Sequence, residues 1–390
     1  MTEPGLIVVG SGPAGVSAAE SFRLHNADWP VTILTDDADH PYFRPPLSKD
    51  YLRGDTDDVA LHDARWFAER NIEVTHGGPV DSIDPAGRTV SVGTKRLPYR
   101  ALVLACGSGP TPLPVPGGEA ALQLRSLSDA RRLREASRSA DSAVVIGAGF
   151  IGCEAAASLA MRGVNTTLIA PEPAPQTKRL GTEAGGRIRG LLDDLGVRYV
   201  GEVAVAGISG GGTDRTAVRL DNGVTIDTDL VLAASGVSPR VGIAAEAGLA
   251  TDSGRVVVGA DMRTSADGIY AAGDVALAFN ASAGRSLAVE HWQDAMDHGE
   301  VAGANAAGGS AEWSAVPGFW TTIGEADLKY HAWGDGYQRS RLLDHGEGFT
   351  VWYEADGAVV GVLTYNADDD YDMAEGLIAE RKPAPVPLGK

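Results

Sequence analysis

The sequence predicts an α/β fold with two related doubly wound domains and a C-terminal α+β domain. A strand, a glycine-rich turn and a helix open the chain, and the same pattern returns about 137 residues later. From about residue 317 the chain becomes richer in aromatic residues and shows alternating strand patterns. A length of 390 residues accommodates two or three such domains.

The first glycine-rich turn has the features of a dinucleotide-binding site. It reads Gly10-Ser-Gly-Pro-Ala-Gly15, between an apolar strand and a helix. Gly10 permits a tight turn, Gly12 lets the backbone approach a pyrophosphate, and Gly15 lets the helix pack on the strand. Asp36 follows 21 residues after Gly15, where a carboxylate accepts from a ribose hydroxyl. This context favours a Rossmann-like site over a glycine turn without a ligand, with phosphates at the helix N-terminus.

The second copy reads Gly147-Ala-Gly-Phe-Ile-Gly152 and also lies between a strand and a helix. An acid at the end of the following strand would favour NADH, but Ala170 stands there. Glu172 is one substitute for that acid, whereas Lys178 and Arg179 are candidates to receive the 2′-phosphate of NADPH. We expect NADH, with NADPH as the open alternative.

A third motif, Ile269-Tyr-Ala-Ala-Gly-Asp274, ends a predicted strand at a Gly-Asp pair. We expect residues 275–279 after it to be helical, so a capped helix start is the alternative interpretation. Beside two dinucleotide fingerprints, the motif favours a flavin. The sequence therefore predicts FAD as cofactor and a nicotinamide dinucleotide as its partner.

Composition and charge exclude several function classes. The formal net charge is −19 and no block of basic residues occurs, so nucleic acid and anionic membranes are not expected partners. The two cysteines, Cys106 and Cys153, form no Cys-x-x-Cys pair, which excludes a local redox disulfide. No apolar run reaches about 18 residues and the start lacks a charged leader, so we expect a cytoplasmic protein. The histidines show no metal-ligand spacing, and we expect no metal. Asp368-Asp-Asp370 is interpreted as a solvated turn.

A further segment, Pro41-Tyr-Phe-Arg-Pro-Pro-Leu-Ser-Lys49, makes a family resemblance specific. The chain resembles FAD-dependent ferredoxin reductases of the putidaredoxin reductase and rubredoxin reductase type, which are related to apoptosis-inducing factor and glutathione reductase. The resemblance covers nearly the whole chain, and in that family this segment packs beside the isoalloxazine. It implies a glutathione-reductase-like arrangement: an FAD-binding domain over residues 1–110 and 240–315, an NAD(P)-binding domain over 111–239, and a C-terminal interface domain over 316–390.

Four shorter segments carry the resemblance along the chain. Leu102-Val-Leu-Ala-Cys-Gly107 is similar to a family strand end that has Thr where Cys106 stands. Leu124-Arg-Ser-Leu-Ser-Asp129 resembles a hinge segment whose arginine reaches FAD. Val289-Glu-His-Trp292 and Phe319-Trp320 resemble segments at the flavin and at the start of the interface domain. His291 has a structural interpretation as well as a functional one, and each tryptophan has core packing as its alternative.

The resemblance and the three motifs together predict the site residues. Lys49 and Glu154 are expected to be the catalytic pair, an ion pair near flavin N5; a solvated lysine and a glutamate that merely favours a helix start are the alternatives. The expected cofactor-binding residues are Gly10, Gly12, Pro13, Ala14, Gly15, Asp36, Asp37, Arg44, Pro45, Lys49, Val80, Ala105, Cys106, Gly107, Arg125, Gly147, Gly149, Phe150, Ile151, Gly152, Glu154, Gly236, Gly273, Asp274, Val289, Glu290, His291, Trp292 and Trp320.

The resemblance implies an NAD(P)H-dependent ferredoxin reductase. Hydride would pass to FAD N5, and single electrons to a [2Fe-2S] or similar ferredoxin that feeds a monooxygenase such as a cytochrome P450. Gly109 and Thr111 depart from the family's arginines, and Thr321-Thr-Ile323 from its Ser-Asp-Gln, which puts the acceptor in doubt. An NAD(P)H oxidase, a quinone or small-molecule reductase and an apoptosis-inducing-factor-like redox sensor are the alternatives.

The resemblance leaves the assembly and the docking surface open. Monomer and homodimer both fit the sequence. An acidic ferredoxin would need a local basic patch on this acidic chain, for which Arg65, Arg70, Arg339 and Arg341 are candidates, or an apolar contact.

Overall fold

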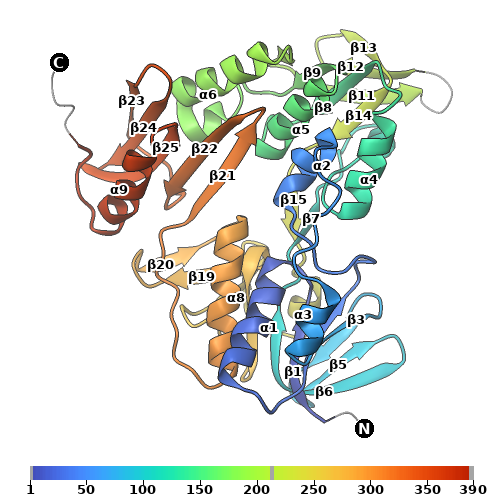
Figure 1. Cartoon of the computed structure of the whole chain (residues 1–390), viewed down its shortest axis with the longest axis vertical. Coiled ribbons are helices and arrows are strands. Elements are labelled where there is room, and N and C mark those ends of the chain that lie inside the picture. Colours follow the sequence, from blue (N-terminus) through green and yellow to red (C-terminus); the bar gives the residue numbers. More distant parts are fainter. Residues whose placement is uncertain (1–2, 211–214, 386–390) are drawn as a thin grey trace. The chain divides into compact units, whose positions relative to one another are not determined.

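In the computed structural model the structure describes residues 3–210 and 215–385, which fall into two compact units (Figure 1). The first unit contains residues 1–43, 60–109 and 238–319, and the second contains 44–59, 110–237 and 320–390. The chain therefore passes between the units five times. Each unit has its own sheets and its own glycine-rich turn between a strand and a helix.

A parallel sheet forms the centre of the first unit. Its order is β3-β2-β1-β6, with β18 paired to the other side of β6. Val9 at the end of β1 is in register with Leu34 of β2 and with Leu104 of β6, so the three strands end at one edge. Strands buried on both faces are continuous apolar runs, which is why residues 6–9 carry no polar alternation. The strands are β1 (Gly5–Val9), β2 (Val31–Thr35), β3 (Ile72–His76), β6 (Lys95–Leu104) and β18 (Ile269–Ala271).

Antiparallel strands complete the first unit. The start of β6 pairs with a hairpin, and a separate four-stranded sheet has the order β16-β17-β19-β20. These strands are β4 (Ser82–Asp84), β5 (Thr89–Val92), β16 (Thr251–Asp252), β17 (Arg255–Val258), β19 (Ala276–Asn280) and β20 (Arg285–Leu287). The helical prediction for residues 275–279 is wrong: a single 3-10 turn, η3 (Gly273–Val275), leads directly into β19. Pairing with β17 supplies backbone hydrogen bonds that local propensity does not anticipate.

Two helices of the first unit pack backbone against backbone. A Cβ on Gly299 would lie 2.2 Å from the carbonyl oxygen of Ala14, and one on Gly303 would lie 2.2 Å from that of Ala18. Only glycine allows this approach, which places α1 (Pro13–His25) beside α8 (Trp292–Ala306) (Figure 1). The shorter helices are α3 (Ala64–Glu69) and α7 (Gly242–Glu246).

The second unit repeats the parallel arrangement in the order β10-β9-β8-β14. A three-stranded antiparallel sheet, β11-β12-β13, packs against it around a buried cluster that includes Ile146, Ile208 and Val218. The strands are β8 (Ser142–Ile146), β9 (Asn165–Ile169), β10 (Arg198–Val200), β11 (Val205–Gly210), β12 (Thr216–Leu220), β13 (Thr225–Thr228) and β14 (Leu230–Ala233). Helices and turns here are η1 (Pro45–Ser48), α2 (Asp50–Arg53), η2 (Gly118–Ala120), α4 (Leu127–Ala136), α5 (Phe150–Met161) and α6 (Thr177–Asp194). Two short strands, β7 (Ser108–Pro110) and β15 (Val237–Pro239), pair with each other.

A five-stranded antiparallel sheet in the order β21-β22-β25-β24-β23 ends the chain, and α9 packs on β25 (Figure 1). Its elements are β21 (Gly318–Ile323), β22 (Ala326–Ala332), β23 (Arg339–Asp344), β24 (Phe349–Ala355), β25 (Ala358–Tyr365) and α9 (Asp368–Ala379). The solvated turn predicted at Asp368–Asp370 is instead the first turn of α9, where Asp368 accepts from Lys329 at 2.7 Å. Carboxylates are stabilising at a helix N-terminus.

The observed architecture confirms the predicted fold class: two Rossmann-like parallel sheets and a C-terminal α+β part. Within residues 3–210 and 215–385, no helix is both long enough and apolar enough to cross a bilayer.

Candidate functional site

The first glycine-rich turn has a shape that only glycine permits. Gly10 has a φ of 109°, and a Cβ there would lie 2.2 Å from the carbonyl oxygen of Ala105. A Cβ on Gly15 would lie 2.0 Å from the carbonyl oxygen of Gly10. Helix α1 starts at Pro13 after Gly12, without a side-chain cap and without an acid in its first turn. Its first N–H groups and its positive dipole end are therefore available to a phosphate.

The second turn has the same glycine geometry as the first. Gly147 has a φ of 103°, and a Cβ on Gly152 would lie 1.9 Å from the carbonyl oxygen of Gly147. A Cβ on Gly149 would meet only the amide of Gln176, at 3.8 Å, so there is room over this residue. Helix α5 starts at Phe150 and also lacks a side-chain cap and a first-turn acid. Ile151, the next residue, is exposed. The chain thus has two helix N-termini whose N–H groups and positive dipole ends can bind phosphates.

The Gly-Asp motif lies beside the first turn. A Cβ on Gly273 would come within 3.1 Å of the Cβ of Ala14. The backbone N–H of Gly273 donates to Nδ1 of His298, at 3.3 Å, from the buried face of α8. Burial lowers the pKa of His298 to about 4, against the opposing effect of Asp294 and Asp274. A neutral imidazole therefore holds the turn that presents Asp274.

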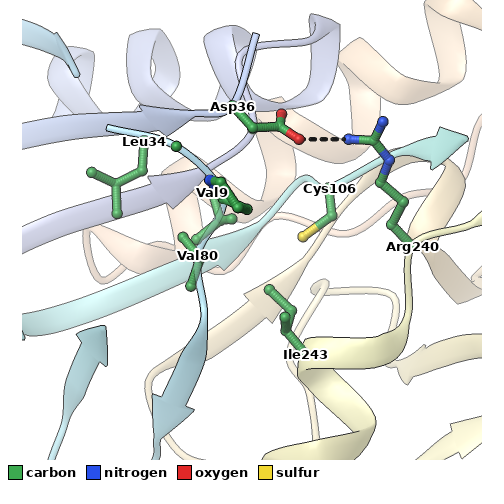
Figure 2. A pocket seen from close by; sticks show the side chains of 10 residues that line it. Val9, Leu34, Asp36, Val80, Cys106, Arg240 and Ile243 are labelled. Atoms are coloured by element: carbon green, nitrogen blue, oxygen red, sulfur yellow. Dashed lines mark hydrogen bonds and ion pairs between the residues drawn. The ribbon is translucent and has the colours of Figure 1, made fainter. Parts of the chain in front are cut away.

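A pocket of about 140 Å³ opens beside the ends of the parallel strands β1 and β2 (Figure 2). Oδ2 of Asp36 is 3.2 Å from Nη1 of Arg240, and Figure 2 shows this half-exposed pair beside the thiol of Cys106. Burial raises the pKa of Cys106 to about 12, although the nearby Arg240 lowers it. The pocket is lined by Val9, Gly10, Leu34, Asp36, Gly78, Pro79, Val80, Cys106, Arg240 and Ile243.

The predicted residues next to this pocket differ in whether they line it or are engaged in hydrogen bonds within the protein. Asp37 accepts from the Tyr42 hydroxyl at 2.7 Å, so of the two acids only Asp36 lines the pocket. Ala105 donates its N–H to Val9, and Gly107 accepts from the backbone N–H of Arg240. Gly109 stands where the family resemblance implies an arginine, and a Cβ there would lie 3.6 Å from Nε of Arg240. Arg240 therefore brings a guanidinium close to position 109, where this chain has glycine and the family resemblance implies an arginine.

The segment from Val289 to Trp292 leads into α8. Val289 is buried, and Glu290 pairs with Arg255 at 2.5 Å. Nδ1 of His291 lies 2.8 Å from a carboxylate oxygen of Asp294, a contact that orients this ring. Trp292 meets Phe43 edge to face at 4.9 Å. These contacts describe where the residues lie, and their contact with a flavin stays a prediction.

The second unit brings Lys49 and Glu154 together in its interior. Nζ of Lys49 lies 2.8 Å from Oε1 of Glu154, and the two residues are 8% and 3% exposed. The solvated-lysine alternative is therefore wrong. The ammonium also donates to the carbonyl oxygen of Pro45 at 3.0 Å. Two acceptors among the described residues leave one of its three N–H groups for a ligand. The catalytic role of the pair stays a prediction.

Glu172, the candidate substitute for the missing strand-end acid, has a defined position. Oε2 of Glu172 accepts the backbone N–H of Lys178 at 2.6 Å, in the first turn of α6. The Arg179 guanidinium lies over the rings of Phe150 and Tyr330, at 5.8 and 5.7 Å. Glu172 therefore puts a negative charge at the start of α6, while the Arg179 guanidinium lies against aromatic rings.

The predicted residues divide between the units. Those in the first unit are Gly10, Gly12, Pro13, Ala14, Gly15, Asp36, Asp37, Val80, Ala105, Cys106, Gly107, Gly273, Asp274, Val289, Glu290, His291 and Trp292. Those in the second are Arg44, Pro45, Lys49, Arg125, Gly147, Gly149, Phe150, Ile151, Gly152, Glu154, Gly236 and Trp320. Trp320 is 39% exposed, and Arg125 donates its backbone N–H to Asp129, the acid of the capping box that starts α4.

Sequence reasoning missed four residues that the structure places in these sites: Ser48, Arg240, His298 and Thr321. Ser48 is inside the Pro-Tyr-x-Arg segment, which was a usable signal. Arg240 and His298 belong to no recognisable motif, and Thr321 stands out in the sequence only as a departure from the resembled family. Their partners lie far away in sequence, so no local pattern indicates them.

Comparisons with known proteins agree with this geometry. The profile of the pyridine nucleotide-disulphide oxidoreductase family matches residues 4–299. Rhodocoxin reductase of Rhodococcus erythropolis is 32% identical over 386 residues, covering 97% of this chain and 90% of that protein. The anthranilate 1,2-dioxygenase system ferredoxin–NAD(+) reductase component of Burkholderia cepacia is 33% identical over 391 residues, covering 97% and 95%. The covalent putidaredoxin reductase–putidaredoxin complex matches with a TM-score of 0.92 at 28% identity, covering 98% of this chain and 94% of that one.

Fold and sites together define a two-dinucleotide oxidoreductase. The chain belongs to the pyridine nucleotide-disulphide oxidoreductase family, which binds FAD and uses NAD(H). Both cysteines of the chain are free thiols, so the family's disulphide chemistry has no local pair here. The residues present fit the cofactors, because both helix N-termini are uncapped and the space over Gly149 is open.

Proposed function

We propose that this protein is an NADH-dependent reductase of a small iron–sulfur ferredoxin, of the [2Fe-2S] or a similar type. The observation that carries the proposal is the pair of uncapped helix N-termini, one behind each glycine-rich turn, in a single chain. One dinucleotide site serves a tightly bound FAD and the other a nicotinamide dinucleotide. FAD, when bound, supplies the conversion of a two-electron hydride donor into a one-electron donor.

The first unit would hold FAD. The first turn, from Gly10 to Gly15, offers N–H groups to the pyrophosphate, Asp36 accepts from a ribose hydroxyl, and Gly273 and Asp274 close the site. The second unit would hold NADH at the turn from Gly147 to Gly152. Glu172 disfavours NADPH, because a 2′-phosphate would meet its carboxylate close to the first turn of α6.

The buried pair of Lys49 and Glu154 has an electrostatic role in this proposal. Glu154 supplies the counter-charge that keeps a buried ammonium favourable, and the free N–H of Lys49 is donated to the bound flavin. A preorganised cation of this kind stabilises negative charge that develops during reduction. The other proposed contacts, including Arg44, Arg125, His291, Trp292 and Trp320, position the cofactors.

The acceptor is inferred from the relatives. One is named as the ferredoxin–NAD(+) reductase component of a dioxygenase system, and a solved relative is joined to putidaredoxin. We infer an acceptor of the same chemistry, in a cytoplasmic electron-transfer chain that serves an oxygenase such as a cytochrome P450. The functional domains would be residues 1–110 with 240–315 for FAD, 111–239 for NADH and 316–390 for the interface.

Anaerobic reduction tests the proposal. The purified protein, loaded with FAD, is titrated with NADH and with NADPH while the flavin absorbance is followed, and is then mixed with a panel of [2Fe-2S] ferredoxins. Bleaching by NADH and reoxidation by a ferredoxin much faster than by oxygen would support the proposal. Rapid oxygen consumption would instead identify an oxidase. A long-lived NADH complex that reduces no ferredoxin would identify a sensor, and failure to bind FAD would contradict the whole proposal.

A further inference from the structure

The buried carboxylate of Glu154 has two hydroxyl donors besides Lys49. Oγ1 of Thr321 lies 2.6 Å from Oε1, the oxygen that also faces Lys49, and Oγ of Ser48 lies 2.5 Å from Oε2. Thr321 is 1% exposed and Glu154 is 3% exposed. The carboxylate is therefore held by three donors from two segments of the chain: Ser48 and Lys49 at the end of η1, and Thr321 on β21.

These hydroxyls do more than satisfy a buried group. A buried ion pair is favourable only when further hydrogen bonds occupy the remaining lone pairs of the carboxylate. Each hydroxyl points the positive end of its dipole at Glu154 and offsets part of the negative charge that this carboxylate presents to Lys49. The positive charge of Lys49 is then less neutralised by Glu154, and it acts more strongly on a ligand that accepts the remaining N–H of the ammonium.

Neighbouring hydroxyls show that the arrangement is specific to these positions. Thr322, the next residue on β21, faces the other way and donates to Asp327 at 2.6 Å. Ser158, also buried, donates to the backbone carbonyl of Ser48 at 2.7 Å and not to the carboxylate. Successive side chains of a strand lie on opposite faces, so Thr321 reaches Glu154 from β21 whereas Thr322 does not.

We propose that Thr321 is a positioning residue that sets the charge balance of the Lys49–Glu154 pair and thereby tunes the reduction potential of the bound flavin. Ser48 supports it from the opposite oxygen. The inference rests on the proposed function, in which Lys49 acts on the flavin. Without the Thr321 hydroxyl, Glu154 would neutralise Lys49 more completely, and the more negatively charged reduced cofactor would lose stabilisation.

The test measures the midpoint potential of bound FAD by equilibration with a reference dye, in the whole protein and without any acceptor. Thr321→Val should shift the equilibrium about three- to tenfold toward oxidised FAD, which is about 15–30 mV lower for a two-electron couple. Thr321→Ser should restore the potential because it keeps the hydroxyl. Thr322→Val is the matched control on the same strand and should leave both the potential and NADH-dependent flavin reduction unchanged.

A second variant separates this inference from the proposed function. Lys49→Gln should lower the potential further than Thr321→Val does. If Lys49→Gln lowers it and Thr321→Val matches the unsubstituted protein, the role of Thr321 is wrong while that of Lys49 stands. If neither changes the potential although FAD binds, the proposed role of the pair fails as well. If the midpoint potential falls as much in Thr322→Val as in Thr321→Val, the effect comes from a general disturbance of β21 and not from the Thr321 hydroxyl. That result would overturn the inference.

Discussion

Acid should destabilise the first unit through His298, the buried imidazole behind the Gly273 turn. The ordinary pKa of histidine, 6.5, is lowered to about 4 in the folded protein, chiefly by burial, and Asp294 and Asp274 only partly oppose this. The unfolded chain therefore binds a proton more readily than the folded one. The stability contribution is complete above pH 6.5 and is lost as the pH falls toward about 4.

The magnitude follows from the two values. At about 1.4 kcal/mol for each pH unit between them, the full loss of unfolding free energy is about 3 kcal/mol. About 1 kcal/mol of it should appear between pH 7.5 and pH 5.5. Protonation of Nδ1 would also remove the acceptor of the Gly273 N–H, so flavin should be released together with the unfolding of this unit.

The assay is urea unfolding at these two pH values, at one FAD concentration because bound cofactor stabilises the folded state by mass action. Tryptophan fluorescence and flavin release are both followed. The comparison protein is His298→Asn, whose amide oxygen can accept from Gly273 but does not titrate. Carboxylates contribute equally to both proteins, so the difference isolates His298. An equal pH dependence in the two proteins would refute the assignment.

Three further predictions concern the nucleotide sites. Glu172→Gln should narrow the preference for NADH over NADPH by about tenfold, because the carboxylate beside Lys178 no longer repels a 2′-phosphate; dissociation constants for NAD⁺ and NADP⁺ measure this. Arg240→Gln should weaken FAD retention about three- to tenfold, since Asp36 would then face the anionic cofactor without its cation; FAD release on dilution measures it, and unchanged release would contradict it. The Cys106 thiol, with its pKa raised to about 12, should react with iodoacetamide at pH 8 about a thousand times more slowly than an ordinary cysteine, and rapid alkylation of the folded protein would show that it is not shielded.

Much of the nucleotide-binding framework was readable from the chain. A Cβ on Gly15 or Gly152 would collide with the carbonyl of the first glycine of the same turn, and Gly10 and Gly147 have a positive φ that glycine tolerates. These constraints are local, so the spacing of the glycines carries them. The same reasoning failed for residues 275–279, where an Ala-Leu-Ala-Phe run looked helical but forms β19 through pairing with β17.

Site residues outside the motifs were not predictable, because their partners are distant in sequence. Thr321 reaches Glu154 across 167 residues, and Arg240 reaches Asp36 across 204. The residues that flank Thr321 and Arg240 in the sequence form no pattern that indicates a contact with a carboxylate. The lysine of the pair was recognisable from its segment, whereas the hydroxyls that share its counter-ion were not.

The sequence by itself determined that two dinucleotides bind, because glycine requirements at tight turns and helix starts are properties of a few consecutive residues. It also excluded a local dithiol relay, since the chain has no closely spaced cysteine pair. Only the tertiary structure decided which charges face each other: that Arg240 pairs with Asp36, that His298 holds the Gly273 turn, and that Thr321 shares Glu154 with Lys49. The physical reason is that burial and electrostatic pairing depend on distance in space, which the packing of remote segments sets.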